Sequence, residues 1–318
     1  MHFSPGLLTD FAPLMNFTQS LTIAKADHSL TLADGRKLAY TDLGDPQGYP
    51  IIFGHGMPGC RLEGHFFHSQ AKRHGFRIIT PDRPGIGGST YQYHRILLDY
   101  PDDIRELADA LGLRRFSHVG WSSGGSRTLA CCYKLHQRID LGVCLSGYTN
   151  FVEYEGTHRL IEATRWPGPQ LARFSPGLMR LLVNVVVWFS RRNPGLYMRE
   201  AEQLVSEEDR RLLQYFLAEE LFRQDQMECL ASGGRAIATD LLTELVDWGF
   251  RLAQIRTPVL VYLGEQDPFI PVDYARHLVK NLSNAQLTLM PETGHLYPLA
   301  GEFQNLLFKR IWKHLNAL

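Results

Sequence analysis

Short apolar runs alternate with longer amphipathic segments along most of the chain. Runs rich in Val, Ile, Leu and Phe predict strands, whereas apolar positions that recur about every three to four residues predict helices. Eight strands are predicted, over 29–33, 37–43, 49–54, 76–80, 116–120, 140–146, 258–264 and 286–290. Strands separated by helices predict an α/β fold with a mostly parallel sheet. The Asp34-Gly35 pair is typical of a tight hairpin, so the sheet is expected to begin with an antiparallel pair.

The alternation stops between residues 148 and 250, where the pattern predicts only helices. These cover about 152–165, 176–192, 194–204, 207–231 and 233–248. A helical block between the sixth and seventh strands predicts a cap, or lid, over the carboxyl edge of the sheet, where ligands bind in open α/β folds. The chain is therefore divided into an N-terminal extension (1–27), an α/β core (28–147 and 251–318) and a helical cap (148–250).

The helix predicted over 176–192 carries an apolar stripe that has two interpretations. The stripe consists of Leu178, Leu181, Leu182, Val185 and Trp188. It could line an apolar substrate chamber, or it could pack the cap onto the core. Packing is favoured, because a buried helix needs such a face in any case.

The N-terminal extension has an amphipathic pattern of its own. One helical face would hold Leu7, Leu8, Phe11, Leu14 and Met15. The segment could dock on the core or on a second subunit, as in a homodimer, and it could equally fray. Its first residues, MHFSPGLLTD, have neither a basic start nor an uninterrupted apolar run, so they are not typical of a secretory signal. We therefore expect a cytoplasmic protein.

Composition and charge narrow the function classes. Of the 318 residues, 44% are hydrophobic and 21% are charged, which is typical of a globular protein. Basic and acidic residues number 33 each, so the overall charge provides no general attraction for nucleic acid or an anionic membrane. The most apolar stretch, 181–189, falls short of the ~20 residues that span a bilayer. Five cysteines without paired spacing argue against a disulfide framework and a zinc site (Cys60, Cys131, Cys132, Cys144 and Cys229).

The strongest chemical signal is Gly120-Trp121-Ser122-Ser123-Gly124-Gly125, which follows a predicted strand and opens a helical pattern. It matches G-x-S-x-G, in which a sharp strand-to-helix turn lifts the serine above the sheet. Its neighbours must be small to avoid clashes, which explains the glycines. A Gly/Ser-rich turn without chemistry is the alternative, but the position between strand and helix favours Ser122 as a nucleophile.

A serine nucleophile needs a base and an acid that orients the base. In this arrangement the acid and then the histidine follow the serine along the chain. Asp267 follows the seventh predicted strand and His295 follows the eighth. All three side chains are therefore expected at the same edge of the sheet. Glu265 and Asp273 are competing acids, and Asp267 is preferred for its position.

An oxyanion hole needs two backbone N–H donors. One is expected from Ser123, directly after the nucleophile. The other is expected from Met57, in the loop His55-Gly56-Met57-Pro58-Gly59 after the third strand. As a bare motif this loop could be only a tight turn, but its place in the strand order supports the chemical interpretation.

Taken together, these motifs resemble the α/β-hydrolase superfamily over about residues 29–316. The resemblance depends on HGMPG (55–59), PDRPGIGGS (81–89), GWSSGG (120–125), GEQD (264–267) and GH (294–295). It implies an eight-stranded sheet, a Ser122–Asp267–His295 triad, a helical cap and no cofactor. It also implies a cis Met57–Pro58 bond.

Several residues depart from individual branches of that superfamily. Serine rather than aspartate at position 122 disfavours the haloalkane dehalogenases and epoxide hydrolases. Proline iminopeptidases usually have glycine where this chain has Met57, and a tryptophan after rather than before the serine. The meta-cleavage C–C hydrolases tend to place tryptophan where this chain has Leu296. No branch fits all of the motifs.

Three function hypotheses remain at this stage. The first is a serine hydrolase that cleaves carboxylic esters of small to medium hydrophobic substrates. The second keeps the triad and changes the bond to an amide, lactone, thioester or C–C bond, because fold does not determine substrate. The third is a receptor for small molecules on the same fold, which the presence of all three triad residues disfavours.

Overall fold

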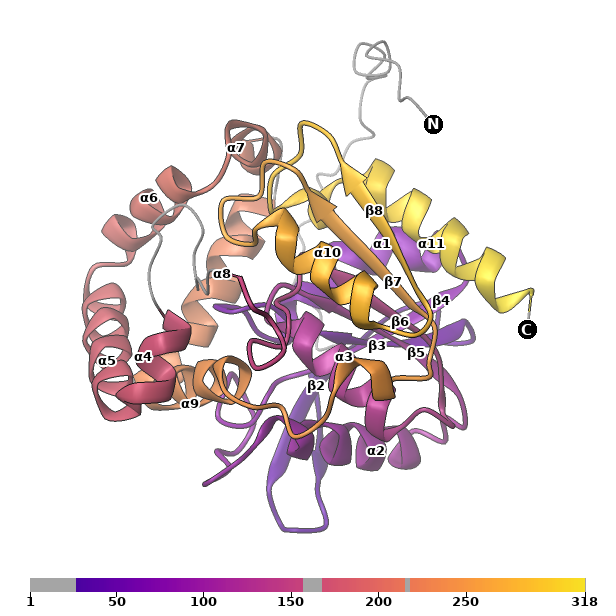
Figure 1. Ribbon diagram of the computed structural model, residues 1–318, viewed down its shortest axis with the longest axis horizontal. Coiled ribbons are helices and arrows are strands. Elements are labelled where there is room, and N and C mark those ends of the chain that lie inside the picture. Colours follow the sequence, from indigo (N-terminus) through magenta and orange to yellow (C-terminus); the bar gives the residue numbers. More distant parts are fainter. Residues whose placement is uncertain (1–26, 157–167, 215–217, 318) are drawn as a thin grey trace.

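The computed structural model describes residues 27–156, 168–214 and 218–317, which form an eight-stranded sheet with helices on both faces (Figure 1). The strands are β1 (Asp27–Thr31), β2 (Lys37–Gly44), β3 (Tyr49–Gly54), β4 (Phe76–Pro81), β5 (Phe116–Trp121), β6 (Ile139–Leu145), β7 (Val259–Gly264) and β8 (Ala285–Met290). Their order is β1-β2-β4-β3-β5-β6-β7-β8. The β1–β2 and β2–β4 pairs are antiparallel and the others are parallel. The predicted fold class and opening hairpin are confirmed.

Helices cover the sheet on both sides and bury the alternating side chains of its strands. These helices are α1 (Gly64–Arg73), α2 (Tyr100–Ala110), α3 (Gly124–Lys134), α10 (Val272–Asn281) and α11 (Gly301–Leu315). Successive strand residues point to opposite faces. In β3, Ile51 and Phe53 belong to the core cluster that α1 and α11 complete, whereas Ile52 belongs to the cluster on the other face, with α2, α3 and α10. Single-turn 3-10 helices occur at Arg61–Glu63, Leu97–Asp99, Leu252–Gln254 and Tyr297–Leu299.

Between β6 and β7 lies a helical insertion, which we define as α4–α9. It contains α4 (Gly168–Phe174), α5 (Pro176–Arg192), α6 (Pro194–Leu204), α7 (Glu207–Gln214), α8 (Ala218–Ala231) and α9 (Gly234–Leu245). Helices α5 and α6 match their predicted ranges, α9 ends three residues before the predicted 248, and the range predicted as one helix over 207–231 contains two, α7 and α8. Helix α4 was not predicted; prolines at both 167 and 169, which are typical of turns, conceal it in the sequence pattern.

The helix predicted over 152–165 is not formed at its start. Residues 151–156 form turns and a bend, and the rest of that range lies outside the described residues. Asn150 accounts for the difference, since its side-chain oxygen accepts the Val152 N–H at 3.2 Å and its carbonyl accepts the Glu153 N–H at 3.1 Å. Such local bonds compete with a helix.

Buried carboxylates of the helical insertion contact loops at the carboxyl ends of the strands. Asp225 on α8 binds the loop after β3, and Asp240 on α9 binds Arg83 after β4. Glu244 on α9 binds Ser123 after β5, and Asp209 on α7 binds His295 after β8. The insertion therefore covers the edge of the sheet where the candidate residues gather.

The apolar stripe of α5 faces solvent, so both interpretations of it were wrong. Leu178, Leu181, Leu182, Val185 and Trp188 are between 38% and 59% exposed. The face of α5 that is buried holds Met179, Val183 and Val187 instead. Helix α5 is apolar on nearly all sides, so the periodicity could not show which face packs against α9.

The N-terminal extension lies almost entirely outside the described residues. Asp27 belongs to β1, so the extension predicted over 1–27 ends one residue earlier. Leu7, Leu8, Phe11, Leu14 and Met15 are not described, and docking of this segment, including a homodimer contact, stays a prediction. In the described ranges no helix has the length and apolarity needed to cross a membrane. All five cysteines are buried free thiols.

Candidate active site

Ser122 stands on a tight turn between β5 and α3. Its φ angle is +54°, in the left-handed region that side-chain-bearing residues rarely adopt. The glycines of the motif make the turn possible. A Cβ atom at Gly124 would clash with the carbonyl oxygen of Gly54 on β3, and one at Gly120 would clash with the carbonyl oxygen of Gly124. Helix α3 therefore begins directly against the sheet, as the motif predicts.

His295 and Asp267 meet although 28 residues separate them in the chain. His295 Nδ1 lies 2.6 Å from Asp267 Oδ2, and both side chains are at most 8% exposed. The other carboxylate oxygen, Oδ1, accepts the N–H groups of Phe269 and Ile270 at 2.9 and 3.0 Å. Asp267 is therefore fixed by the turn after β7, with one oxygen directed at the imidazole.

Contacts with Trp121 place His295 beside the turn that carries Ser122. The Trp121 indole Nε1–H donates to the carbonyl oxygen of His295 at 3.2 Å, and the two rings are 5.9 Å apart. Trp121 directly precedes Ser122. The three residues predicted to form a triad thus lie at the same carboxyl edge of the sheet, with His295 in contact with Asp267 and with the residue before Ser122.

The competing acids lie elsewhere. Glu265 is exposed, and the exposed Asp273 pairs with Arg276 at 3.2 Å on the surface of α10. Among the three acids that the sequence offered, the structure brings only Asp267 to His295.

Asp209 is a participant that the sequence did not reveal. Its two carboxylate oxygens accept the backbone N–H groups of His295 and Leu296, both at 2.8 Å. Asp209 lies on α7, 86 residues before His295, and the residues around it in the sequence form no recognisable motif. This side chain ties the loop after β8 to the helical insertion.

The environment of His295 favours its protonated form. Burial alone would lower the pKa of His295, but the negative charge of Asp267 and its hydrogen bond, together with the charge of Asp209, raise that pKa above its ordinary value of 6.5. The imidazole is therefore a stronger base than a free histidine.

Side chains from three directions hold the loop His55–Cys60. Arg83 donates to the carbonyl oxygens of His55 and Gly56. Glu63 accepts the Gly56 N–H at 2.9 Å, Gln226 donates to the Pro58 carbonyl at 2.6 Å, and Asp225 accepts the Cys60 N–H at 2.8 Å. The Met57–Pro58 bond is cis, as the resemblance implied. The Met57 backbone therefore has a fixed orientation near Ser122, whose Cβ lies close to Gly56.

We call the four side chains that hold this loop (Glu63, Arg83, Asp225 and Gln226) the clamp. The pH dependence of thermal stability tests the part that Asp225 has in it. Burial raises the pKa of Asp225 from 3.8 to about 7, so the folded protein binds a proton that the unfolded chain releases above about pH 4. Stability supported by that proton is fully present below about pH 4 and is lost as the pH rises through the folded-state pKa of about 7. An Asp225→Asn variant keeps an oxygen acceptor and carries no charge. We expect its Tm, relative to wild type, to increase between about pH 5 and pH 8; a constant difference in thermal unfolding would contradict this.

The side chain of Ser123 is fixed in a buried ionic cluster. Ser123 Oγ donates to Glu244 at 2.7 Å and accepts from Arg127 at 2.9 Å. Arg127 also pairs with Asp240, which pairs with Arg83 and Arg95. Three cationic partners outweigh burial and lower the pKa of Asp240. In the sequence this cluster is marked on α9 only by two acids one turn apart, Asp240 and Glu244.

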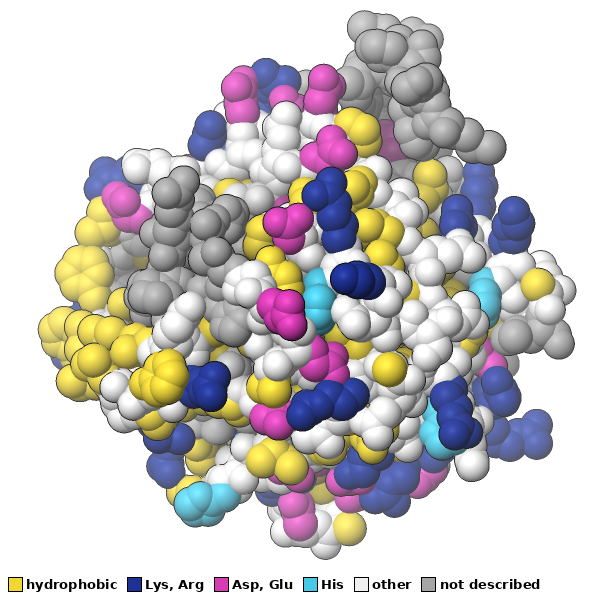
Figure 2. Space-filling view, in the orientation of Figure 1, with side chains coloured by type: hydrophobic (Ala, Val, Ile, Leu, Met, Phe, Trp, Pro, Cys, Tyr) yellow, Lys and Arg dark blue, Asp and Glu magenta, His cyan; other side chains and the backbone are white. Residues whose placement is uncertain are grey.

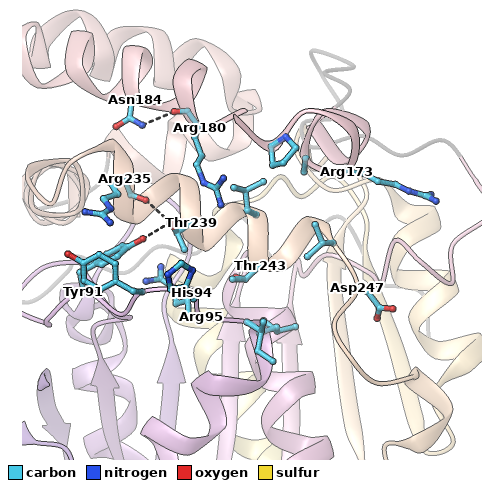
Figure 3. A pocket seen from close by; sticks show the side chains of 17 residues that line it. Tyr91, His94, Arg95, Arg173, Arg180, Asn184, Arg235, Thr239, Thr243 and Asp247 are labelled. Carbon is cyan, nitrogen blue, oxygen red and sulfur yellow. Dashed lines mark hydrogen bonds between the residues drawn. The ribbon is translucent and has the colours of Figure 1, made fainter. Parts of the chain in front are cut away.

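A cavity of about 740 Å³ lies between α4, α5, α9 and the segment 91–97 (Figure 3). Arg180 reaches from α5 toward His94 and Thr239, and Arg235 stacks on the rings of Tyr91 and Tyr93 at 4.6 Å. Thr243 also lines the cavity and accepts a hydrogen bond from Arg127 at 3.1 Å. Ser122, Asp267 and His295 are not among its lining residues. Within the described parts of the chain, no cluster of three or more His, Cys, Asp or Glu residues could hold a metal ion.

Comparison with known proteins agrees with this fold. The family model for the alpha/beta hydrolase fold matches residues 49–300. The chain belongs to the α/β-hydrolase fold family. This α/β-hydrolase is 28% identical over 277 residues to a 2-hydroxy-6-oxononadienedioate/2-hydroxy-6-oxononatrienedioate hydrolase of Burkholderia vietnamiensis, which covers 82% of this chain and 86% of that protein. Lipase 1 of Psychrobacter immobilis is 25% identical over 275 residues, 84% of this chain and 78% of the lipase.

Solved structures show the same fold. A thermophilic esterase from Thermogutta terrifontis aligns with a TM-score of 0.67 at 22% identity, covering 92% of this chain and 98% of the esterase. An enol-lactonase from Burkholderia xenovorans aligns with a TM-score of 0.57 at 18% identity, covering 91% of this chain and all of the lactonase (100%). The relatives are named for hydrolysis of different bonds, and this α/β-hydrolase is accordingly an enzyme of the hydrolase class.

Proposed function

We propose that this α/β-hydrolase cleaves carboxylic esters of small to medium hydrophobic substrates through a Ser122–His295–Asp267 triad. The observation that carries the proposal is the 2.6 Å contact between His295 Nδ1 and Asp267 Oδ2, beside a serine held at positive φ. A serine hydroxyl is a weak nucleophile without an oriented base, so Ser122 needs His295 as the base and Asp267 to orient it.

In the proposed reaction, Ser122 Oγ attacks the acyl carbon while His295 accepts its proton. Asp267 holds the proton on Nδ1, so that Nε2 is free to act as the base, and stabilises the imidazolium that forms. His295 then gives the proton to the leaving alcohol, and the acyl group stays on Ser122. A water molecule, deprotonated by the same histidine, releases the acid and restores the serine.

The backbone N–H groups of Met57 and Ser123 are the proposed oxyanion donors. Preorganised donors aimed at the developing charge provide a large share of such catalysis. The clamp on the His55–Cys60 loop and the ionic cluster around Ser123 support this role, because they restrict both backbones before substrate binds. The helical insertion would serve as the cap, since its carboxylates hold the loops of the site.

The raised pKa of His295 makes a prediction about pH dependence. The base is active only when the imidazole is neutral, which requires a pH above its pKa. Because that pKa lies above 6.5, kcat/KM for an ester should fall on the acidic side with a midpoint above about pH 6.5. Initial rates between about pH 5 and pH 9 measure this midpoint. A midpoint at or below the ordinary pKa of histidine would contradict the role of His295 as the base.

A series of p-nitrophenyl esters of increasing acyl length tests the ester proposal directly. Turnover that rises and then falls with acyl length would support an ester hydrolase with a pocket of limited size. If no ester is hydrolysed, the bond must be an amide, lactone, thioester or C–C bond, or the protein is a non-enzymatic receptor.

A further inference from the structure

Helix α5 presents an unusually apolar surface to solvent. Eight of the fourteen exposed large hydrophobic residues in the described part of the chain fall between residues 174 and 189. They are Phe174, Leu178, Leu181, Leu182, Val185, Val186, Trp188 and Phe189. Figure 2 shows these side chains as a yellow patch at the left, over the position of α5 in Figure 1. Contiguous apolar patches are rare on soluble proteins and usually mark an interaction surface.

The packing of α5 on α9 explains why this face stays outside. Gly234 on α9 lies against Asn184, where a Cβ atom would be 2.6 Å from the Asn184 Cα. Met179, Val183 and Val187 fill the resulting contact. The helix therefore has one apolar face committed to the protein and a second one without a protein partner among the described residues.

The charged side chains around the apolar patch of α5 indicate which kind of partner could bind there. Residues 168–199 contain five arginines and no acidic residue: Arg173, Arg180, Arg191, Arg192 and Arg199. All five are exposed. Arg180 reaches into the cavity, and Arg199 lies 4.0 Å from Glu200, so Arg173 and Arg192 are the two that contact aromatic rings of the patch. Arg192 lies over the Trp188 ring at 4.1 Å, and Arg173 lies over the Phe174 ring at 5.2 Å. The zero net charge of the chain conceals this local excess of positive charge.

We propose that the α5 surface binds peripherally to an anionic lipid membrane. A helix with aromatic and aliphatic residues on one face and arginines beside them lies in the plane of the bilayer interface, with its apolar face among the acyl chains. The arginines then meet the negative headgroups. This inference concerns binding alone and does not depend on the proposed ester hydrolysis.

Two other partners, a second copy of the chain and the N-terminal residues 1–26, fit the positive charge of the α5 surface less well. A second copy of the chain, docked through the same face, would bring the positive charges of Arg173 and Arg192 against like charges. Residues 1–26 contain one acid, Asp10, and one base, Lys25, so they offer no net negative charge to the arginines. An anionic lipid surface satisfies both the apolar face and the charge.

Sedimentation with vesicles tests the proposal. The full chain is mixed with vesicles of phosphatidylcholine alone, or of phosphatidylcholine with phosphatidylglycerol. We expect binding to the mixed vesicles to be at least about tenfold stronger, and to weaken as salt increases. A Leu181→Glu/Val185→Glu variant should lose at least about tenfold in binding. Arg173→Glu/Arg192→Glu should lose about fivefold or more for each charge, because these two arginines lie over aromatic rings of the patch.

Leu306→Glu is the matched control, because Leu306 is a 41% exposed leucine on α11, outside the patch. It should bind as wild type does, and circular dichroism and Tm should show that every variant is folded. The proposal is overturned if the wild-type protein does not bind the mixed vesicles, or if the control loses as much binding as the α5 variant. It is also overturned if analytical ultracentrifugation shows a dimer that Leu181→Glu/Val185→Glu dissociates while vesicle binding is absent.

Discussion

Ser122→Ala should lower kcat for ester hydrolysis by about 10⁵-fold or more, with little change in KM or Tm. The substitution removes the atom that forms the acyl-enzyme, and the residual rate would come from the oxyanion donors and from substrate binding. Alanine is smaller than serine, so it fits the turn without a new clash. Steady-state kinetics with a p-nitrophenyl ester, together with thermal unfolding, measures both quantities.

Ser123→Ala is the matched control for this variant. It keeps the backbone N–H that is proposed to bind the oxyanion and loses only the hydroxyl that contacts Glu244 and Arg127. Activity should stay within about tenfold of wild type. If the two variants were equally inactive, the roles assigned to the two serines would be wrong.

Asp267→Asn should lower kcat by about 10⁴-fold while the protein stays folded. The geometry specifies how the amide must sit. Asp267 Oδ1 accepts two backbone N–H groups, from Phe269 and Ile270, so the amide oxygen of asparagine must take that position. Its NH₂ group then faces His295 Nδ1, which has to become an acceptor. The ring proton moves to Nε2, where the base is needed, and the histidine can no longer accept the serine proton.

Asp273→Asn controls for the loss of a negative charge near the same turn. Asp273 is an exposed acid at the start of α10 that pairs with Arg276. The Asp273→Asn variant should have almost the same kcat as wild type. Kinetics that show Asp267→Asn within about tenfold of wild type, or Asp273→Asn as impaired as Asp267→Asn, would contradict the triad assignment.

The fold was predictable because its strands carry their own signals. All eight predicted strands agree with the structure to within two residues at each end. The glycines at 120 and 124 likewise identify the turn at Ser122, since only glycine allows α3 to start against β3. Parallel strands that end at one edge then bring Asp267 and His295 together without further information.

The supporting carboxylates could not be predicted, because they act across long separations. Asp225 contacts a loop 165 residues away, and Asp209 contacts one 86 residues away. Both lie on helices where an acid is normally solvated. The orientation of α5 was equally hidden, because two of its faces are apolar and only the tertiary contact at Gly234 selects one of them.

The central claim is that Ser122 is an activated nucleophile. Labelling with a fluorophosphonate probe, followed by mass mapping of the labelled peptide, tests it most directly, because the probe reacts only with a serine that a base activates. The account predicts one label, on Ser122, that is absent from Ser122→Ala and strongly reduced in Asp267→Asn. An unlabelled Ser122 in the folded wild-type protein would contradict the account and indicate a binding protein on this fold.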